Sequence, residues 1–78
     1  SFMANILTLN EMRDRYDGEW VMIAYTETDP ETLEVLRGEV LAHSPNSQDV
    51  YAAMPIAQGR GVAFEFFGHI PENVAFIL

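Results

Sequence analysis

The sequence of 78 residues contains no cysteine, so it forms neither a disulfide nor a site with a thiolate ligand or nucleophile. This absence fits a reducing compartment. No stretch approaches the ~20 apolar residues that a membrane helix needs, and no signal peptide follows Met3. We therefore expect a cytoplasmic protein without membrane contact. Ser1 and Phe2 are interpreted as a cloning remnant, which leaves residues 3–78 as one domain.

Basic residues are scarce, since four arginines oppose twelve acidic residues and give a net charge of −8. Such a charge repels phosphate backbones, so direct binding of nucleic acid is not expected, whereas a basic protein partner would suit it. A chain this short buries only about 60% of the surface that its unfolded form exposes. Small domains of this kind often complete their core by self-association, which predicts a homodimer.

Two short apolar runs, residues 20–25 and 62–67, are rich in β-branched and aromatic residues and follow Gly18 and Gly61. This pattern predicts two strands lying side by side in one sheet. Between the N-terminus and the first run, Thr8 and Glu11 have the spacing of a capping box. A helix over residues 9–16 is therefore expected, ended by Gly18.

Residues 32–43 allow two interpretations. With Asp29 as N-cap and Gly38 as terminator, a short helix would end at Arg37. The alternation of apolar residues favours instead one long strand, with a bulge at Gly38, that pairs with the first strand as a hairpin.

A second helix is predicted near residues 47–54, capped by Asn46 or Ser47 and ended or kinked at Pro55. Its inner stripe would be Val50, Tyr51 and Met54. The expected fold class is thus α+β: a small, mainly antiparallel sheet with a β-β-α-β core, one helix packed on a face, and a short N-terminal helix over one end.

Several segments also resemble a family of small bacterial and archaeal domains of unknown function. They are Tyr16-x-Gly18-x-Trp20-Val21, Gly38-x-Val40-Leu41-Ala42-His43, Val50 in the helix, and Ile70-Pro71-Glu72. The likeness covers residues 16–72 and implies a strand–strand–helix–strand fold. It implies no activity that could be transferred to this chain.

Candidate catalytic residues are few. His43, Ser44 and Asp49 suggest a hydrolytic triad, but neighbours on a strand point to opposite faces, so Ser44 is not expected to reach His43. His43 and His69, with Asp49 or Glu65, are weak candidates for a zinc site. No catalytic residue and no cofactor are predicted, and a minimal metal-dependent or hydrolytic enzyme is kept as the alternative.

Three further patterns have simpler structural interpretations. An acidic cluster around Pro30 predicts a solvated hairpin tip and not a calcium loop. The segment 58–61 predicts a linker in which Arg60 forms an ion pair. The aromatic residues of the two strands predict a core under the helix and not a base-stacking platform; they are Trp20, Tyr25, Phe64 and Phe66.

The end of the sequence is strongly apolar, and such a segment is expected to pack or to contact a second copy. The predicted contact residues are Val74, Phe76, Ile77 and Leu78. Taken together, these patterns predict a non-enzymatic protein-interaction or regulatory module, such as an antitoxin-like subunit, that acts as a homodimer and docks by strand addition.

Overall fold

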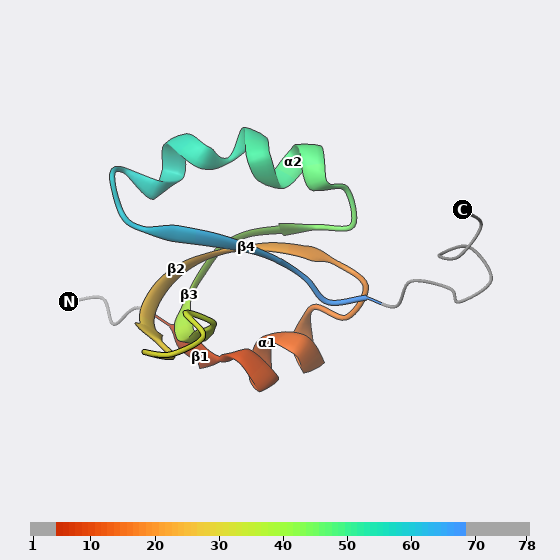
Figure 1. The fold of residues 1–78 in the computed structure, drawn as a ribbon. Coiled ribbons are helices and arrows are strands. Elements are labelled where there is room, and N and C mark those ends of the chain that lie inside the picture. Colours follow the sequence, from red (N-terminus) through yellow and green to blue (C-terminus); the bar gives the residue numbers. More distant parts are fainter. Residues whose placement is uncertain (1–4, 69–78) are drawn as a thin grey trace, which may run out of the picture.

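The computed structural model describes residues 5–68, which form an antiparallel sheet of four strands with helical segments on both of its faces (Figure 1). This confirms the predicted α+β class. No helix in this range has the length and apolarity to cross a membrane. The elements in chain order are β1 (Ile6–Thr8), α1 (Leu9–Arg15), β2 (Trp20–Thr28), β3 (Val35–Ser44), α2 (Ser47–Ala52), the 3-10 turn η1 (Met54–Ala57) and β4 (Val62–Phe66).

The two apolar runs lie side by side, as predicted, because β2 pairs antiparallel with β4. Trp20 lies opposite Phe66 and Met22 opposite Phe64. The sheet order is β1-β3-β2-β4, so β2 and β3 are central, and β1 and β4 are the edges. The buried apolar residues of the sheet lie mainly in β2, from Val21 to Ala24, whereas β3 contributes only Val35.

Residues 35–44 form one long strand, so the strand interpretation of this region is confirmed and the helix interpretation is wrong. The bulge predicted at Gly38 is misplaced. Gly38 pairs with Tyr25 and Arg37 pairs with Glu27, so the extra residue at this register shift is Thr26 in β2. Gly38 is needed for another reason, namely close contact between β3 and β2.

Helix α1 begins with the capping box predicted from the sequence. The N–H of Glu11 donates to Oγ1 of Thr8, and the N–H of Thr8 donates to the Glu11 carboxylate. The helix covers one face of the sheet (below it in Figure 1) and not an end, because Met12 is fully buried in a cluster with Val21 and Ile23. The remaining buried members of this cluster are Leu7, Val35 and Phe67.

Helix α2 and η1 lie over the opposite face, above the sheet in Figure 1. Asn46 is the N-cap, and its side chain accepts from the N–H of Gln48. Val50 is buried as predicted, but Tyr51 and Met54 are exposed, so the prediction of an inner stripe was wrong for these two residues. A helix of only six residues presents little more than one side chain to the sheet, and Pro55 diverts the chain into the 3-10 turn.

Candidate functional site

The α2 side of the molecule exposes a group of large apolar side chains. Two ring contacts organise it: Trp20 lies 5.0 Å from Phe66 and Tyr51 lies 4.8 Å from Phe64, measured between ring centroids. Many of these side chains remain exposed, by between 39% and 55% for Phe66, Tyr51, Met54 and Ile56. We call this surface the apolar face and define it by Trp20, Tyr51, Met54, Ile56, Phe64 and Phe66.

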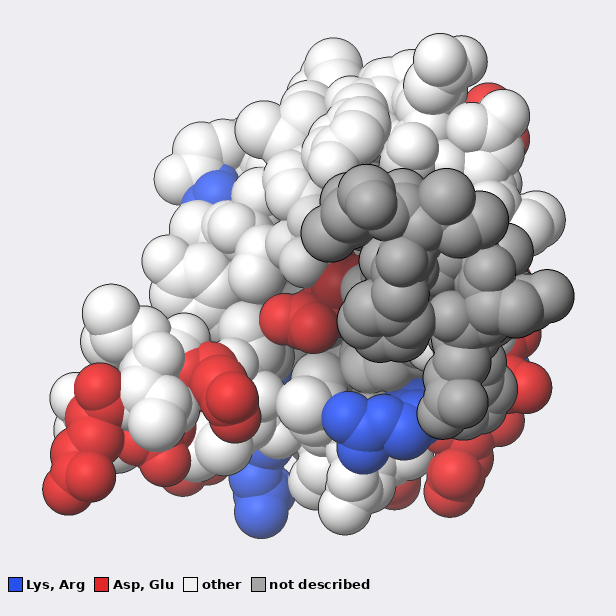
Figure 2. Space-filling view, turned by 45° about the vertical axis from the view of Figure 1, so that its right-hand side comes forward, with Lys and Arg blue, Asp and Glu red and all other residues white. Residues whose placement is uncertain are grey.

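Charge is nearly absent from the apolar face. The segment 44–59, which includes α2 and η1, holds a single charged residue, Asp49. At the border of the face Arg60 donates to Glu39 over 2.8 Å, so these two charges are paired with each other. Figure 2 shows the result: the part of the molecule covered by α2 and η1 is almost wholly white, while acidic side chains gather in the lower half.

Strand β4 borders the apolar face and is paired on one side only within residues 5–68. The N–H of Phe67, directly after the strand, donates to the carbonyl of Glu19, directly before β2. Because backbone groups alternate in direction along an antiparallel strand, those of Ala63 and Glu65 also point toward β2. The N–H and C=O groups of Val62, Phe64 and Phe66 therefore point to the free edge.

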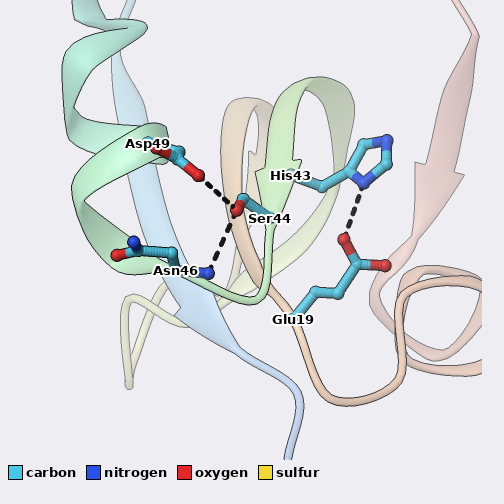
Figure 3. A network of polar contacts seen from close by, with 5 residues as sticks. All are labelled: Glu19, His43, Ser44, Asn46 and Asp49. Atoms are coloured by element: carbon cyan, nitrogen blue, oxygen red, sulfur yellow. Dashed lines mark hydrogen bonds and ion pairs between the residues drawn. The ribbon is translucent and has the colours of Figure 1, made fainter.

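The triad considered from the sequence is not formed (Figure 3). Oγ of Ser44 donates to Oδ2 of Asp49 over 2.9 Å and accepts from the N–H of Asn46 over 3.0 Å. Nδ1 of His43 lies 2.8 Å from Oε1 of Glu19, on the other side of the strand. Thus the alternation of side chains along β3 separates the hydroxyl from the imidazole, as predicted, and Ser44 acts at the entry of α2.

The contact between His43 and Glu19 was not predicted from the sequence. Glu19 precedes β2 and His43 lies near the end of β3, and only the antiparallel register brings them together. The ring of Tyr16 lies 4.4 Å from the imidazole of His43, between ring centroids, and covers one side of it. Both side chains of the pair are partly exposed, which is typical of a surface contact.

The zinc site is not supported by the described part of the chain, because no group of three candidate ligands occurs within residues 5–68. His43 and Glu65 both pair with Val21, one from β3 and one from β4, so a central strand lies between them. His69 lies outside the described residues, as do the predicted contact residues Val74, Phe76, Ile77 and Leu78.

The acidic cluster forms the tip of the β2–β3 hairpin. Oδ1 of Asp29 accepts from the N–H groups of Glu31 and Thr32, over 2.8 and 3.0 Å. These two backbone bonds lower the pKa of Asp29 below its usual value. Glu27 lies 3.3 Å from Arg37 of β3. The carboxylate of Asp29 is thus occupied by the turn itself, in line with the predicted solvated tip.

The aromatic residues divide between the two faces of the sheet. Trp20, Phe64 and Phe66 lie on the α2 side, whereas Tyr25 approaches Gly61 on the opposite side. The prediction of one aromatic core under the helix was therefore wrong for Tyr25, and also for Phe66, which is exposed. Side chains alternate between the two faces along a strand, which places residues 20, 22 and 24 on one face and residues 21, 23 and 25 on the other. The position of Tyr25 on the opposite face from Trp20 could therefore have been predicted from the sequence.

A cavity of about 400 Å³ lies on the α1 side, where α1 and the end of β4 meet. The guanidinium carbon of Arg13 lies 5.7 Å from the centre of the Phe67 ring. Charged side chains of both signs line the cavity, namely Arg13, Asp14, Asp17 and Glu65, together with Phe66, Phe67 and Gly68. Sequence reasoning missed it because its lining comes from two segments far apart in the chain, residues 13–17 and 65–68.

Comparison with known proteins gave no match to a family model, to a curated protein or to a solved structure. The resemblance to a family of small domains of unknown function therefore stays a prediction.

Proposed function

We propose that this protein is a non-enzymatic protein-interaction module that acts as a homodimer through its apolar face. The observation that supports this proposal is the contrast between the apolar face and the rest of the molecule. A chain with a net charge of −8 repels its own copies. The apolar face is where this repulsion is weakest and where burial of side chains is most favourable.

The energetic argument is one of exposed area. Each Å² of apolar surface removed from water contributes about 25 cal/mol. A stable interface buries about 800 Å² on each partner. Four large side chains of the apolar face are exposed by more than a third. Aromatic residues and methionine are also the types enriched at the centre of interfaces. Burial of these side chains against a second copy is therefore favourable.

The oligomeric state tests this proposal directly. Light scattering or sedimentation of the full chain at tens of micromolar should give twice the 8.8 kDa of one chain. Ile56→Glu should shift the mass toward that of the monomer, because it places a charge in the contact surface. Leu33→Glu is the matched control, since Leu33 is 74% exposed but lies at the hairpin tip. A mass of 8.8 kDa for the unmodified chain contradicts the proposal.

The acidic surface outside the apolar face suits a basic protein partner, as expected for a regulatory, antitoxin-like subunit. The hairpin tip offers the densest group of acidic residues, namely Glu27, Asp29, Glu31 and Glu34. Glu31→Gln with Glu34→Gln should weaken the binding of an oligo-arginine peptide, and raising the salt concentration should have the same effect on the unmodified chain. Equal affinity of both proteins for the peptide argues against this partner class. A cytoplasmic location stays a prediction.

A further inference from the structure

We infer that the two copies join by antiparallel pairing of β4 with β4 of the second copy, about a two-fold axis at Phe64, so that the two sheets become one continuous sheet. This inference rests on the proposed homodimer and specifies its geometry. The occupant of the β4 edge is a second copy of this chain.

The first argument is the state of the β4 edge. Edge strands that stay unpaired usually carry proline, lysine or inward-pointing charges that prevent pairing. The sequence of β4, Val-Ala-Phe-Glu-Phe, contains neither proline nor lysine. Its only charge, Glu65, lies on the α1 side of the sheet, where it lines the cavity next to Arg13 and is not part of the buried cluster, so it does not point into the core. The other edge, β1, is a strand of only three residues and offers little to pair with.

The second argument is that one register satisfies the outward backbone groups of β4. Val62, Phe64 and Phe66 point their N–H and C=O groups to the free edge, as derived above from the bond between Phe67 and Glu19. A two-fold axis at Phe64 places Phe64 opposite its own copy and Val62 opposite Phe66 of the second copy. Each of these pairs exchanges two hydrogen bonds, as in any narrow antiparallel pair.

The third argument is charge. With the axis at Phe64, Glu65 lies opposite Ala63 of the second copy, so two negative charges do not meet. An axis at Glu65 would place the two carboxylates directly opposite each other, which destabilises a strand pair. An axis at Ala63 would place Phe66 opposite Arg60, which lies outside β4 and is already paired with Glu39. The axis at Phe64 is therefore favoured over its neighbours.

The same geometry explains why the apolar face belongs to the contact. A two-fold axis perpendicular to the sheet keeps the α2 sides of both copies on one side of the joint sheet. The ring of Phe64 then lies opposite its own copy and diagonal to Phe66 of the second copy, and aromatic cross-strand pairs contribute about 0.5–1.5 kcal/mol beyond burial. Tyr51, which lies against Phe64, extends this contact toward α2.

Disulfide trapping tests the register, and the chain is suited to it because it has no native cysteine. In a narrow antiparallel pair the Cα atoms lie about 5.5 Å apart, within the range of a disulfide. Phe64→Cys should therefore form a cross-linked dimer under mild oxidation. Ala63→Cys alone and Glu65→Cys alone should not, because the rise along the strand and the strand spacing place each about 8 Å from its own copy.

A mixture of the Ala63→Cys and Glu65→Cys proteins should cross-link, and it does so with Phe64 intact. This mixture keeps the test decisive if Phe64→Cys fails to fold or to dimerise. Cross-linking of Glu65→Cys alone, or of Ala63→Cys alone, overturns the register. Hydrogen exchange gives an independent readout: the amides of Val62, Phe64 and Phe66 should become protected as the protein concentration rises through the dimerisation range.

The outcomes separate this inference from the proposed function. If light scattering shows only a monomer, both the proposed homodimer and the pairing of β4 are contradicted. A dimer whose Val62, Phe64 and Phe66 amides exchange as freely as those of the dilute protein, and whose cysteine variants give no cross-link at the expected positions, leaves the proposed function in place and overturns the pairing of β4.

Discussion

Gly38 and Ile23 approach each other so closely that a methyl group added to Gly38 would lie 2.5 Å from Cγ2 of Ile23. The same methyl group would lie 2.7 Å from the carbonyl oxygen of Ala24 and 2.9 Å from Cα of Tyr25. Gly38 pairs with both β1 and β2, so the backbone around it is hydrogen-bonded on two sides. Neighbouring backbone atoms cannot move away without breaking the centre of the sheet.

Gly38→Ala is therefore expected to lower the free energy of unfolding by at least about 2 kcal/mol, since overpacking against backbone costs more than against a flexible side chain. Gly59→Ala is the control. It has a positive φ of 83° but no atom near the added methyl group, so we expect a loss of about 1 kcal/mol. Urea unfolding of both variants measures the two values. Equal losses in the free energy of unfolding would show that the close contact with Ile23 does not add to the destabilisation of Gly38→Ala.

The decrease in the free energy of unfolding at acidic pH should depend on Glu11 and Asp29. The N–H and then the hydroxyl of Thr8 lower the pKa of Glu11 from its ordinary 4.5, and the N–H groups of Thr32 and Glu31 lower that of Asp29 from 3.8. A lowered pKa in the folded state means that the ionised carboxylate stabilises the fold at pH values above the ordinary pKa. This stabilisation is lost as the pH falls through the folded-state pKa, because the group then binds its proton in both states.

Glu11→Gln with Asp29→Asn should therefore reduce the loss of stability between about pH 5 and pH 2. The difference between the double variant and the unmodified chain should be largest near neutral pH and vanish at the acidic end. Thermal unfolding followed by circular dichroism across this range is the measurement. A curve parallel to that of the unmodified chain would exclude a role for the two carboxylates. Asp14→Asn is a suitable control, since it removes an exposed carboxylate from the same helix as Glu11.

The sequence was most informative where a local rule acts alone. The capping box at Thr8 and Glu11 and the strand at residues 62–66 follow from spacing and composition within a few residues. The exposure of Tyr51 and Met54 could not be predicted in this way. They lie one and four residues after Val50, at spacings that a helix can place near the same face. Whether the sheet covers them depends on how far it extends beneath the short helix α2, which local spacing does not show.

Contacts between distant segments were the least predictable part of the candidate site. Glu19 and His43 meet because β2 and β3 are antiparallel and in a given register, and the register depends on bulges that no local signal placed. The position of β4 at an edge of the sheet formed by residues 5–68 likewise follows from the strand order. The sequence predicted that a strand edge would dock a partner, but not which strand would lie at the edge.

Ser44 and Asp49 should be energetically coupled as parts of the entry to α2. Ser44→Ala removes both the bond to Asp49 and the acceptor for the N–H of Asn46, so we expect a loss of about 1 kcal/mol in the free energy of unfolding. A double-mutant cycle with Asp49→Ala should give a coupling energy of about 0.5–1 kcal/mol. Additive losses would show that the hydrogen bond between the two side chains contributes nothing in solution.

Val50 and Ile56 should separate the stability of the fold from that of the dimer. Val50 is buried between α2 and the sheet, so Val50→Ala should lower the free energy of unfolding by about 2 kcal/mol at every protein concentration. Ile56 is exposed by 55% on the apolar face, so Ile56→Ala should cost little in the monomer. In the homodimer it should weaken association, and association raises apparent stability only where the dimer is populated. Urea unfolding at two protein concentrations, one below and one above the dimerisation range, therefore distinguishes the two variants. The loss for Ile56→Ala should appear only at the higher concentration, and a loss of equal size at both would show that Ile56 stabilises the monomer and not the dimer.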